Sequence, residues 1–259
     1  MFFFYRISSR SQVGPSQNET NKPRPDYFDK KKIFINFIKT FGTDNLYVIA
    51  DSCDDDFLTF IKNTLETYSV NKIINLTVTN FGNGCDTFKY SVQLAFNLYE
   101  KKTIHSNDIL YFVEDDYIHR NDSKNVLKEG LDIFHYLTLY DHPDKYVNAN
   151  TINEKGVVGN PYISNSSELT RVYLGEKCHY KLTNSTTMTF ATKTKTILED
   201  WKFMLPYLKT SFPFDFNMFI ELNKQNRSLG CTIPSYSTHC ESTYLAPLID
   251  WKSELILPQ

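Results

Sequence analysis

"DILYFVEDDYIHR", residues Asp108–Arg120, is the stretch that decides the fold. Its five apolar residues, Ile109–Val113, run without a break, which is typical of a parallel strand covered on both faces. Three acids follow at once: Glu114, Asp115 and Asp116. Adjacent carboxylates at a strand end are costly unless a cation neutralises them, and ligands of open parallel sheets bind outside these ends. The stretch therefore indicates either a cation-dependent ligand site or a solvated acidic turn.

Strand and helix patterns alternate upstream of this stretch. Period-2 or unbroken apolar runs predict strands at 2–8, 45–51, 72–80 and 108–113, and 3.6-residue periodicity predicts helices at 26–42, 54–68 and 84–102. Gly42 suits a helix C-cap. A polar loop, Ser9–Pro25, is longer than an ordinary connection, so we expect it to be functional or mobile. This alternation predicts a parallel sheet with helices on both faces.

The rhythm changes after Arg120. The patterns predict a helix at 122–137, a strand at 185–193, helices at 195–208 and 214–225, and a strand with a turn at 229–242. Residues 140–182 show no clean period, and "YDHPDKY" at 140–146 fits either an acceptor contact or a rigid polar turn. No linker divides the chain, so we expect one domain.

Composition narrows the class of protein. The chain has 259 residues, 41% of them hydrophobic and 15% aromatic, which is ample for a packed core. A net charge of −2 gives no global field toward nucleic acid or an anionic membrane. No apolar run approaches the ~20 residues of a transmembrane helix, and "MFFFYRIS" fits a strand better than a signal peptide. Five cysteines without a CxxC pair argue against zinc and disulfides and favour the cytoplasm.

Residues 80–117, "NFGNGCDTFKYSVQLAFNLYEKKTIHSNDILYFVEDDY", resemble the core of a nucleotide-sugar glycosyltransferase of the GT-A fold, especially the broad family 2. That family runs an Asn- and Gly-containing turn, a helix with a basic residue, and a strand ending in D-x-D type acids. The resemblance extends more weakly over Phe2–Glu241. It implies a Rossmann-type, mainly parallel α/β sheet with helices on both faces. The single domain, 1–259, would have a nucleotide-sugar-binding lobe at 1–120 and an acceptor-binding, catalytic lobe at 121–259.

The resemblance also implies roles for individual residues. Asp116 would hold the Mn²⁺ or Mg²⁺ that bridges the donor diphosphate, and His239 in "STHCES" would join the metal shell. The general base would be Asp215 in "PFDFNMF", with Asp200 of the literal "ED" pair as the alternative. The remaining candidates would bind the nucleotide-sugar: Tyr5, Arg6, Ser8, Asp51, Gly84, Lys89, Glu114 and Asp115. For Asp51, the N-cap of the following helix is an equally good interpretation.

The predicted function is metal-dependent transfer of a sugar from a nucleoside diphosphate sugar, with UDP favoured, to a hydroxyl of a glycan, protein or lipid-linked acceptor. The presence of a candidate base favours inversion. The alternatives are a sugar-nucleotide nucleotidyltransferase, for which "SSRSQVG" supplies no convincing Gly-rich loop, and an inactive GT-A domain that binds a glycan or a partner. If the chain stays extended, Glu114 and Asp116 point to one side and Asp115 to the other.

Overall fold

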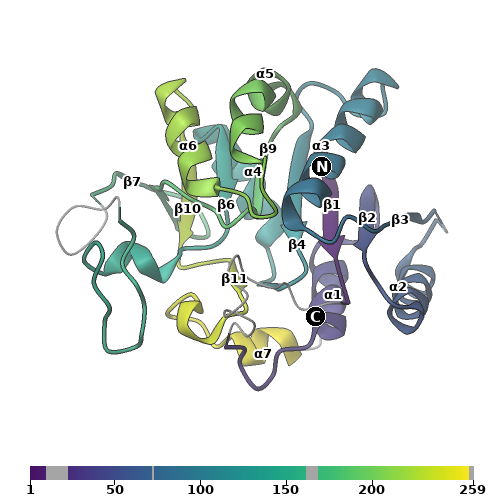
Figure 1. The fold of residues 1–259 in the computed structure, drawn as a ribbon, viewed down its shortest axis with the longest axis horizontal. Coiled ribbons are helices and arrows are strands. Elements are labelled where there is room, and N and C mark those ends of the chain that lie inside the picture. The colour runs from purple at the N-terminus through teal and green to yellow at the C-terminus, as the bar shows by residue number, and fades with distance from the viewer. Residues whose placement is uncertain (10–22, 72, 162–168, 257–259) are drawn as a thin grey trace.

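The computed structural model describes residues 1–9, 23–71, 73–161 and 169–256. It is an α/β fold built on a nine-stranded sheet with the order β3-β2-β1-β4-β9-β6-β10-β8-β7, which runs across Figure 1 from β3 at the right to β7 at the left. Most of the predicted functional or mobile loop at Ser9–Pro25 lies outside the described residues.

The strands of this sheet are β1 (Phe2–Ile7), β2 (Leu46–Asp51), β3 (Asn75–Thr79), β4 (Ile109–Glu114), β6 (Tyr136–Thr138), β7 (Val172–Tyr173), β8 (His179–Leu182), β9 (Phe190–Lys193) and β10 (Leu229–Ile233). A second, two-stranded sheet pairs β5 (Tyr117–His119) with β11 (Ser237–His239). The helices are α1 (Lys30–Phe41), α2 (Asp55–Tyr68), α3 (Gly84–Glu100), α4 (Ser123–Ile133), α5 (Thr194–Met204), α6 (Asp215–Lys224) and α7 (Trp251–Ile256).

The first half of the sheet is parallel and the second half is mixed. β3, β2, β1 and β4 pair in parallel. β9 runs antiparallel to both β4 and β6. Its first residue, Phe190, pairs with Phe112 near the end of β4. β8 runs antiparallel to β10, and β7 runs antiparallel to β8. The prediction of a mainly parallel sheet therefore holds for the first four strands, and the sheet as a whole is mixed.

Helices cover both faces of the sheet, as the sequence predicts. Alternation along β1 sends Phe3 and Tyr5 toward α1, α2 and α4, and sends Phe2 and Phe4 toward α3, α5 and α6. These two apolar layers form the main cores. A third cluster packs the C-terminal segment around Trp251 against Ile33 of α1 and Tyr117 of β5.

Helix boundaries follow local capping chemistry. Asp29, Asp54 and Asn83 cap α1, α2 and α3 by accepting backbone N–H groups, and Gly42 ends α1 with φ +81°, as predicted for a C-cap. The predicted helix at 122–137 is too long. It ends at Ile133, because the next residues form β6, which pairs with β10.

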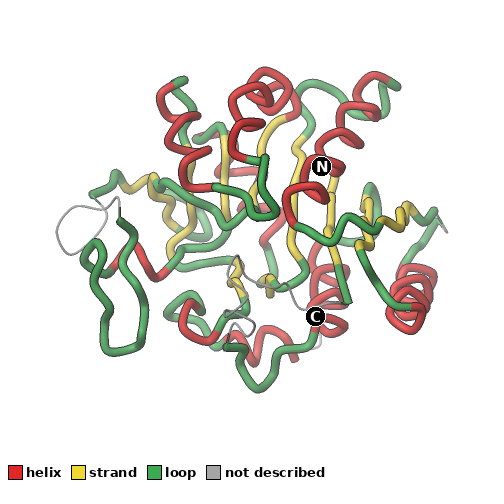
Figure 2. Tube along the Cα trace, in the orientation of Figure 1, coloured by secondary structure: helices red, strands yellow, loops and turns green. Residues whose placement is uncertain are grey.

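Loops and short elements gather at one edge of the sheet, the lower edge in Figures 1 and 2. The β5–β11 ribbon and α7 lie there. β5 follows β4 after only two residues, so this is the edge at which β1 and β4 end. Asp115 and Asp116, which lead into β5, are buried at this edge, and Glu114 is partly buried.

Candidate functional site

The acid triplet lies where the strand order reverses. β1 is flanked by β2 on one side and β4 on the other, so the chain winds outward in two directions from this pair. In open α/β sheets, the crevice outside the carboxyl ends of such a strand pair is the usual ligand site. Ser8 follows β1, and Glu114 ends β4. The topology alone therefore marks this edge of the sheet as a candidate binding site, independently of the acids.

The three acids diverge, and the prediction of an alternating extended chain is wrong. Only Glu114 belongs to β4; Asp115 and Asp116 form the turn that leads into β5. Each carboxylate meets a different basic side chain, contributed by a different part of the chain. The repulsion expected of adjacent acids is therefore offset within the protein itself.

Asp115 joins the two strand ends. Its Oδ2 accepts the backbone N–H of Ser8 at 2.8 Å and lies 2.8 Å from Lys30 Nζ. The same Nζ donates to the Ser8 carbonyl at 2.8 Å. The Asp115 side chain is 11% exposed and that of Lys30 is 13% exposed. Asp115, Ser8 and the start of α1 are thus held in one compact network.

Glu114 pairs with Arg6 across β4 and β1. The guanidinium lies 3.5 Å from the Glu114 carboxylate, donates to the Met188 carbonyl at 2.7 Å, and lies 5.3 Å from the centre of the Phe88 ring. Burial lowers the pKa of Arg6, while Glu114 acts in the opposite direction. Arg6 therefore links the switch point to α3 on one side and to the loop before β9 on the other.

Asp116 and His239 face one another. His239 Nε2 lies 2.9 Å from Asp116 Oδ2, and its Nδ1 lies 3.6 Å from Glu241. Arg24 also reaches Asp116 Oδ2, at 3.0 Å, and donates to the Cys240 carbonyl at 2.6 Å. Both Asp116 and His239 are buried. β11 supplies His239 through its pairing with β5, in which His239 lies opposite Tyr117.

The Asp116–His239 pair presents one carboxylate oxygen and one imidazole nitrogen, which are close enough to bond each other directly and are also of the types that ligate a divalent ion. Two ligands ~2.0–2.1 Å from an octahedral ion and at right angles to each other are ~2.9 Å apart, which is the separation found here. A carboxylate oxygen suits either Mn²⁺ or Mg²⁺, and an imidazole nitrogen shifts the preference toward Mn²⁺. No group of three or more metal-ligating side chains occurs within 1–9, 23–71, 73–161 and 169–256. Further ligands would have to come from a diphosphate or water.

Asp215 lies one loop away from the acids. It is the first residue of α6, and its Oδ2 accepts the backbone N–H groups of Thr186 and Thr187 at 3.0 and 2.9 Å. Thr187 and Met188 both have left-handed backbone angles, φ +49° and +60°, a strained choice for a β-branched residue. Tyr117, next to Asp116, hydrogen-bonds Thr187 through its hydroxyl. Asp215 is thus linked through Thr187 to Tyr117, the residue after Asp116.

Asp200 has a different environment. Its side chain is 2% exposed, lies 2.8 Å from Arg227 Nε, and accepts the Tyr136 hydroxyl at 2.8 Å. These contacts tie α5 to β6 and to the turn between α6 and β10, which contains Arg227. Of the two candidate bases, only Asp215 contacts the loop that reaches Tyr117 and Arg6.

The nucleotide-side candidates divide between the core and the sheet edge. Tyr5 is fully buried, with its ring centre 4.7 Å from that of Phe37. Asp51 accepts the N–H groups of Phe81 and Gly82 at 2.6 and 2.9 Å, so it fastens the end of β2 to the turn before α3. Asp54, and not Asp51, is the N-cap of α2.

The predicted Gly turn leads into α3 as expected. Gly84 is its first residue, and Asn83 caps it by accepting the Asp86 N–H at 2.9 Å. Lys89 pairs with Asp86 at 2.5 Å on a partly exposed face of the helix. Arg6 is the cation that contacts the acid triplet from β1, whereas the described ion pair of Lys89 is local to α3.

Sequence reasoning missed Arg24, Lys30 and Glu241. Arg24 and Lys30 are 92 and 85 residues away from their acid partners along the chain. No local pattern signals such pairs. The one available cue was the basic run Lys30–Lys32 at a helix start, where the helix dipole disfavours positive charge.

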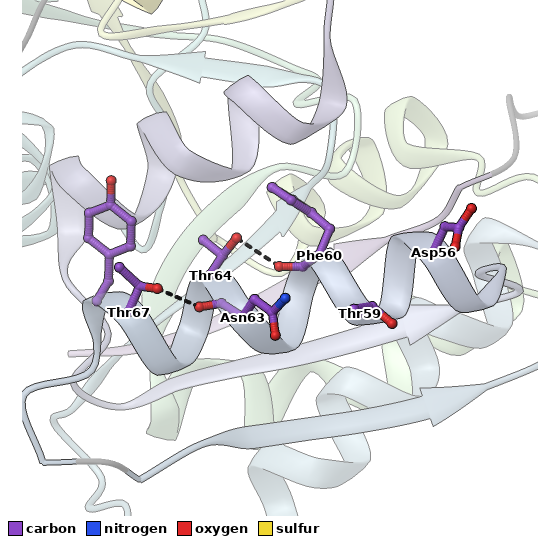
Figure 3. Close-up of a pocket in the computed structure, with 7 residues that line it drawn as sticks. Asp56, Thr59, Phe60, Asn63, Thr64 and Thr67 are labelled. Carbon is purple, nitrogen blue, oxygen red and sulfur yellow. Dashed lines mark hydrogen bonds between the residues drawn. The ribbon is translucent and has the colours of Figure 1, made fainter.

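A separate hollow of about 410 Å³ lies along the outer side of α2 (Figure 3). It is lined by Asp56, Thr59, Phe60, Asn63, Thr64, Thr67 and Tyr68. The hydroxyls of Thr64 and Thr67 donate to carbonyls of their own helix at 2.8 and 2.7 Å. These polar groups do not converge on a common point, so the hollow lacks the character of a ligand site.

Comparison with known proteins adds no relative: no protein-family model matches the chain, and no curated protein matches it. None of the helices in the described part of the chain combines the length and apolarity needed to span a bilayer.

Proposed function

We propose that the protein is a GT-A glycosyltransferase similar to family 2, which transfers a sugar from a nucleoside diphosphate sugar to an acceptor hydroxyl with inversion. UDP is the favoured nucleotide. The observation that carries the proposal is the Asp116–His239 pair, 2.9 Å apart, at the carboxyl end of β4 beside the switch point. Asp215, held across the loop at 186–188, supports it as the candidate base.

Each side chain has a distinct task in this proposal. Asp116 and His239 hold a divalent ion, which when bound neutralises charge that develops on the leaving diphosphate. Arg6 and Ser8, at the carboxyl end of β1, would lie on the donor side of the site. Asp215 takes the proton of the acceptor hydroxyl, and the two N–H groups on its Oδ2 fix the orientation of the carboxylate.

The test is the melting temperature with Mn²⁺, UDP, or both. We expect a clear rise only with both, because two protein ligands make a weak cage without a diphosphate. Asp116→Asn should abolish the rise. Asp132→Asn is the matched control, because the Asp132 side chain is 79% exposed and pairs with Lys193 at the surface. An equal response to UDP in EDTA, or an unchanged response in Asp116→Asn, would contradict the proposal.

A second candidate is a GT-A domain that binds without turnover. One observation favours it: basic side chains of the protein itself, from Arg6, Lys30 and Arg24, already lie against the three acids. Hydrolysis of UDP-sugars in the presence of Mn²⁺ separates the two candidates. Detectable release of UDP supports the enzyme, and binding without release supports the second function.

A further inference from the structure

A cavity of about 370 Å³ opens at the carboxyl ends of β6 and β10. Its described lining consists of Asp141, Tyr146, Ile233, Pro234, Ser235, Pro247 and Leu248. The volume falls within the ~300–1,000 Å³ of ordinary small-molecule sites. The walls are mainly apolar, and a few polar groups converge on them, which is the composition of a binding cavity rather than of a packing defect.

The cavity shares an edge of the sheet with the acid triplet. β6 runs antiparallel to β9, which runs antiparallel to β4, so β6 and β4 end on the same side. Tyr140 precedes Asp141 in the chain, and its ring lies edge-on to that of Tyr117 with 5.8 Å between centres. Tyr117 directly follows Asp116. Two packed tyrosines therefore join the cavity to the proposed donor site.

The rim of the cavity carries an unusual leucine. Leu248 is 81% exposed and has a left-handed backbone with φ +73°. A left-handed backbone is uncommon and strained for a residue with a branched side chain, whereas an exposed leucine by itself is ordinary. The backbone thus places an apolar side chain at the rim, where a ligand in the cavity would cover it.

The floor of the cavity is polar but balanced in charge. Asp141 is 4% exposed; one carboxylate oxygen lies 2.9 Å from Lys181 Nζ, and the other accepts the Tyr146 hydroxyl. Lys181 is itself buried and lies 4.5 Å from the centre of the Tyr146 ring. The Asp141–Lys181 pair offers no uncompensated charge to an ionic ligand. The hydroxyl groups of a neutral ligand, in contrast, can donate hydrogen bonds to the lone pairs of the Asp141 carboxylate oxygens.

We propose that this cavity binds a neutral pyranose ring, with its apolar face against Leu248 and the prolines and its hydroxyls toward Asp141 and Tyr146. The assignment of this ring as the acceptor rests on the proposed transferase function. The proposal that the cavity binds the ring does not rest on that function. A sugar bears apolar C–H faces and a polar rim in one small, uncharged molecule, and this combination matches the walls and floor of the cavity.

The experiment measures binding without nucleotide or metal, so that its outcome is independent of catalysis. Saturation-transfer difference NMR is titrated with methyl glucoside, methyl galactoside and methyl mannoside, and with methyl glucuronide as the anionic counterpart. We expect at least one neutral glycoside to bind and the glucuronide to bind at least tenfold more weakly. Absence of binding by every neutral glycoside, or equal binding of the glucuronide, overturns the proposal.

Two variants localise the binding. Leu248→Ala should weaken the bound glycoside at least fivefold, whereas Leu174→Ala, the same change at a leucine that is 83% exposed elsewhere, should leave it unchanged. Leu248→Gly should weaken binding without lowering the melting temperature, because glycine relieves the left-handed backbone. Unchanged affinity in both Leu248 variants refutes the site. Failure of the transferase proposal is recognised separately, by the lack of a joint response to Mn²⁺ and UDP.

Discussion

Asp115→Ala should destabilise the protein without removing its response to Mn²⁺ and UDP. From the sequence, Asp115 is a candidate for binding the nucleotide-sugar and is expected to point away from Glu114 and Asp116. The structure gives it two charge-assisted hydrogen bonds, from the Ser8 N–H and from Lys30, at 2.8 Å each. Asp116 is held by His239 and Arg24 instead, so the proposed metal ligands should remain in place.

The magnitude follows from burial. Breaking a fully buried charge pair by removing one partner costs ~3–5 kcal/mol. Here Lys30 is 13% exposed and keeps its bond to the Ser8 carbonyl, so water and that carbonyl offset part of the loss. We expect a loss of about 2–3 kcal/mol, which for a chain of this size lowers the melting temperature by about 4–12 °C.

Guanidinium and thermal melts of Asp115→Ala and Asp132→Ala provide the comparison. Asp132 also pairs with a lysine, at 3.3 Å, but its side chain is 79% exposed. Its removal should change the free energy of unfolding by no more than about 0.5 kcal/mol. If the two variants lose the same stability, the network around Asp115 does not hold the strand ends together, and the reasoning from burial is refuted.

Three further predictions concern the surroundings of the site. Arg24→Gln should raise the affinity for Mn²⁺ at least threefold in calorimetry, since it removes a cation 3.0 Å from Asp116, and weaker binding would contradict this competition. Asp215→Asn should reduce transfer ~10²–10⁴-fold with donor binding intact. Asp200→Asn should instead lower the melting temperature, because it weakens the ion pair that the buried Asp200 carboxylate makes with Arg227. Burial lowers the pKa of His119 from 6.5 to about 3. Between these two pH values the unfolded chain binds a proton at His119 that the folded chain does not bind. Stability is then full above the unfolded pKa and falls as the pH drops toward 3, by about 2 kcal/mol from pH 7 to pH 5, and His119→Gln should lack this part of the pH dependence in guanidinium melts.

The parallel half of the fold could be predicted because its signals are local. Unbroken apolar runs mark β2 and β4, and helical periodicity with caps marks α1 to α3. The predictions failed where pairing over long distances decides the structure. β6 was absorbed into a predicted helix, because "YL" at 136–137 continues the apolar period of α4. Only its partner β10, more than 90 residues away, makes it a strand.

The site was predictable in position but not in its electrostatics. The strand-end rule locates the acids from sequence, since it needs only β4 and the residues after it. The direction of each carboxylate depends on the turn at 115–116 and on two basic residues that are distant in sequence: Arg24, from the segment before α1, and Lys30, the first residue of α1. Tertiary contacts likewise distinguish Asp215 from Asp200, because the sequence alone shows only two acids in neighbouring helices.

Charge balance at the site explains why the proposed ligands should bind together. The three acids carry three negative charges, and Arg6, Lys30 and Arg24 bring three positive charges within 3.5 Å of them. A divalent ion alone must compete with Arg24 for Asp116, and a diphosphate alone must compete with the acids for the basic groups. The ion and the diphosphate neutralise each other, so the pair enters a balanced site with little net charge to bury. In the proposed function, a site built in this way would therefore favour the metal–nucleotide complex over either component.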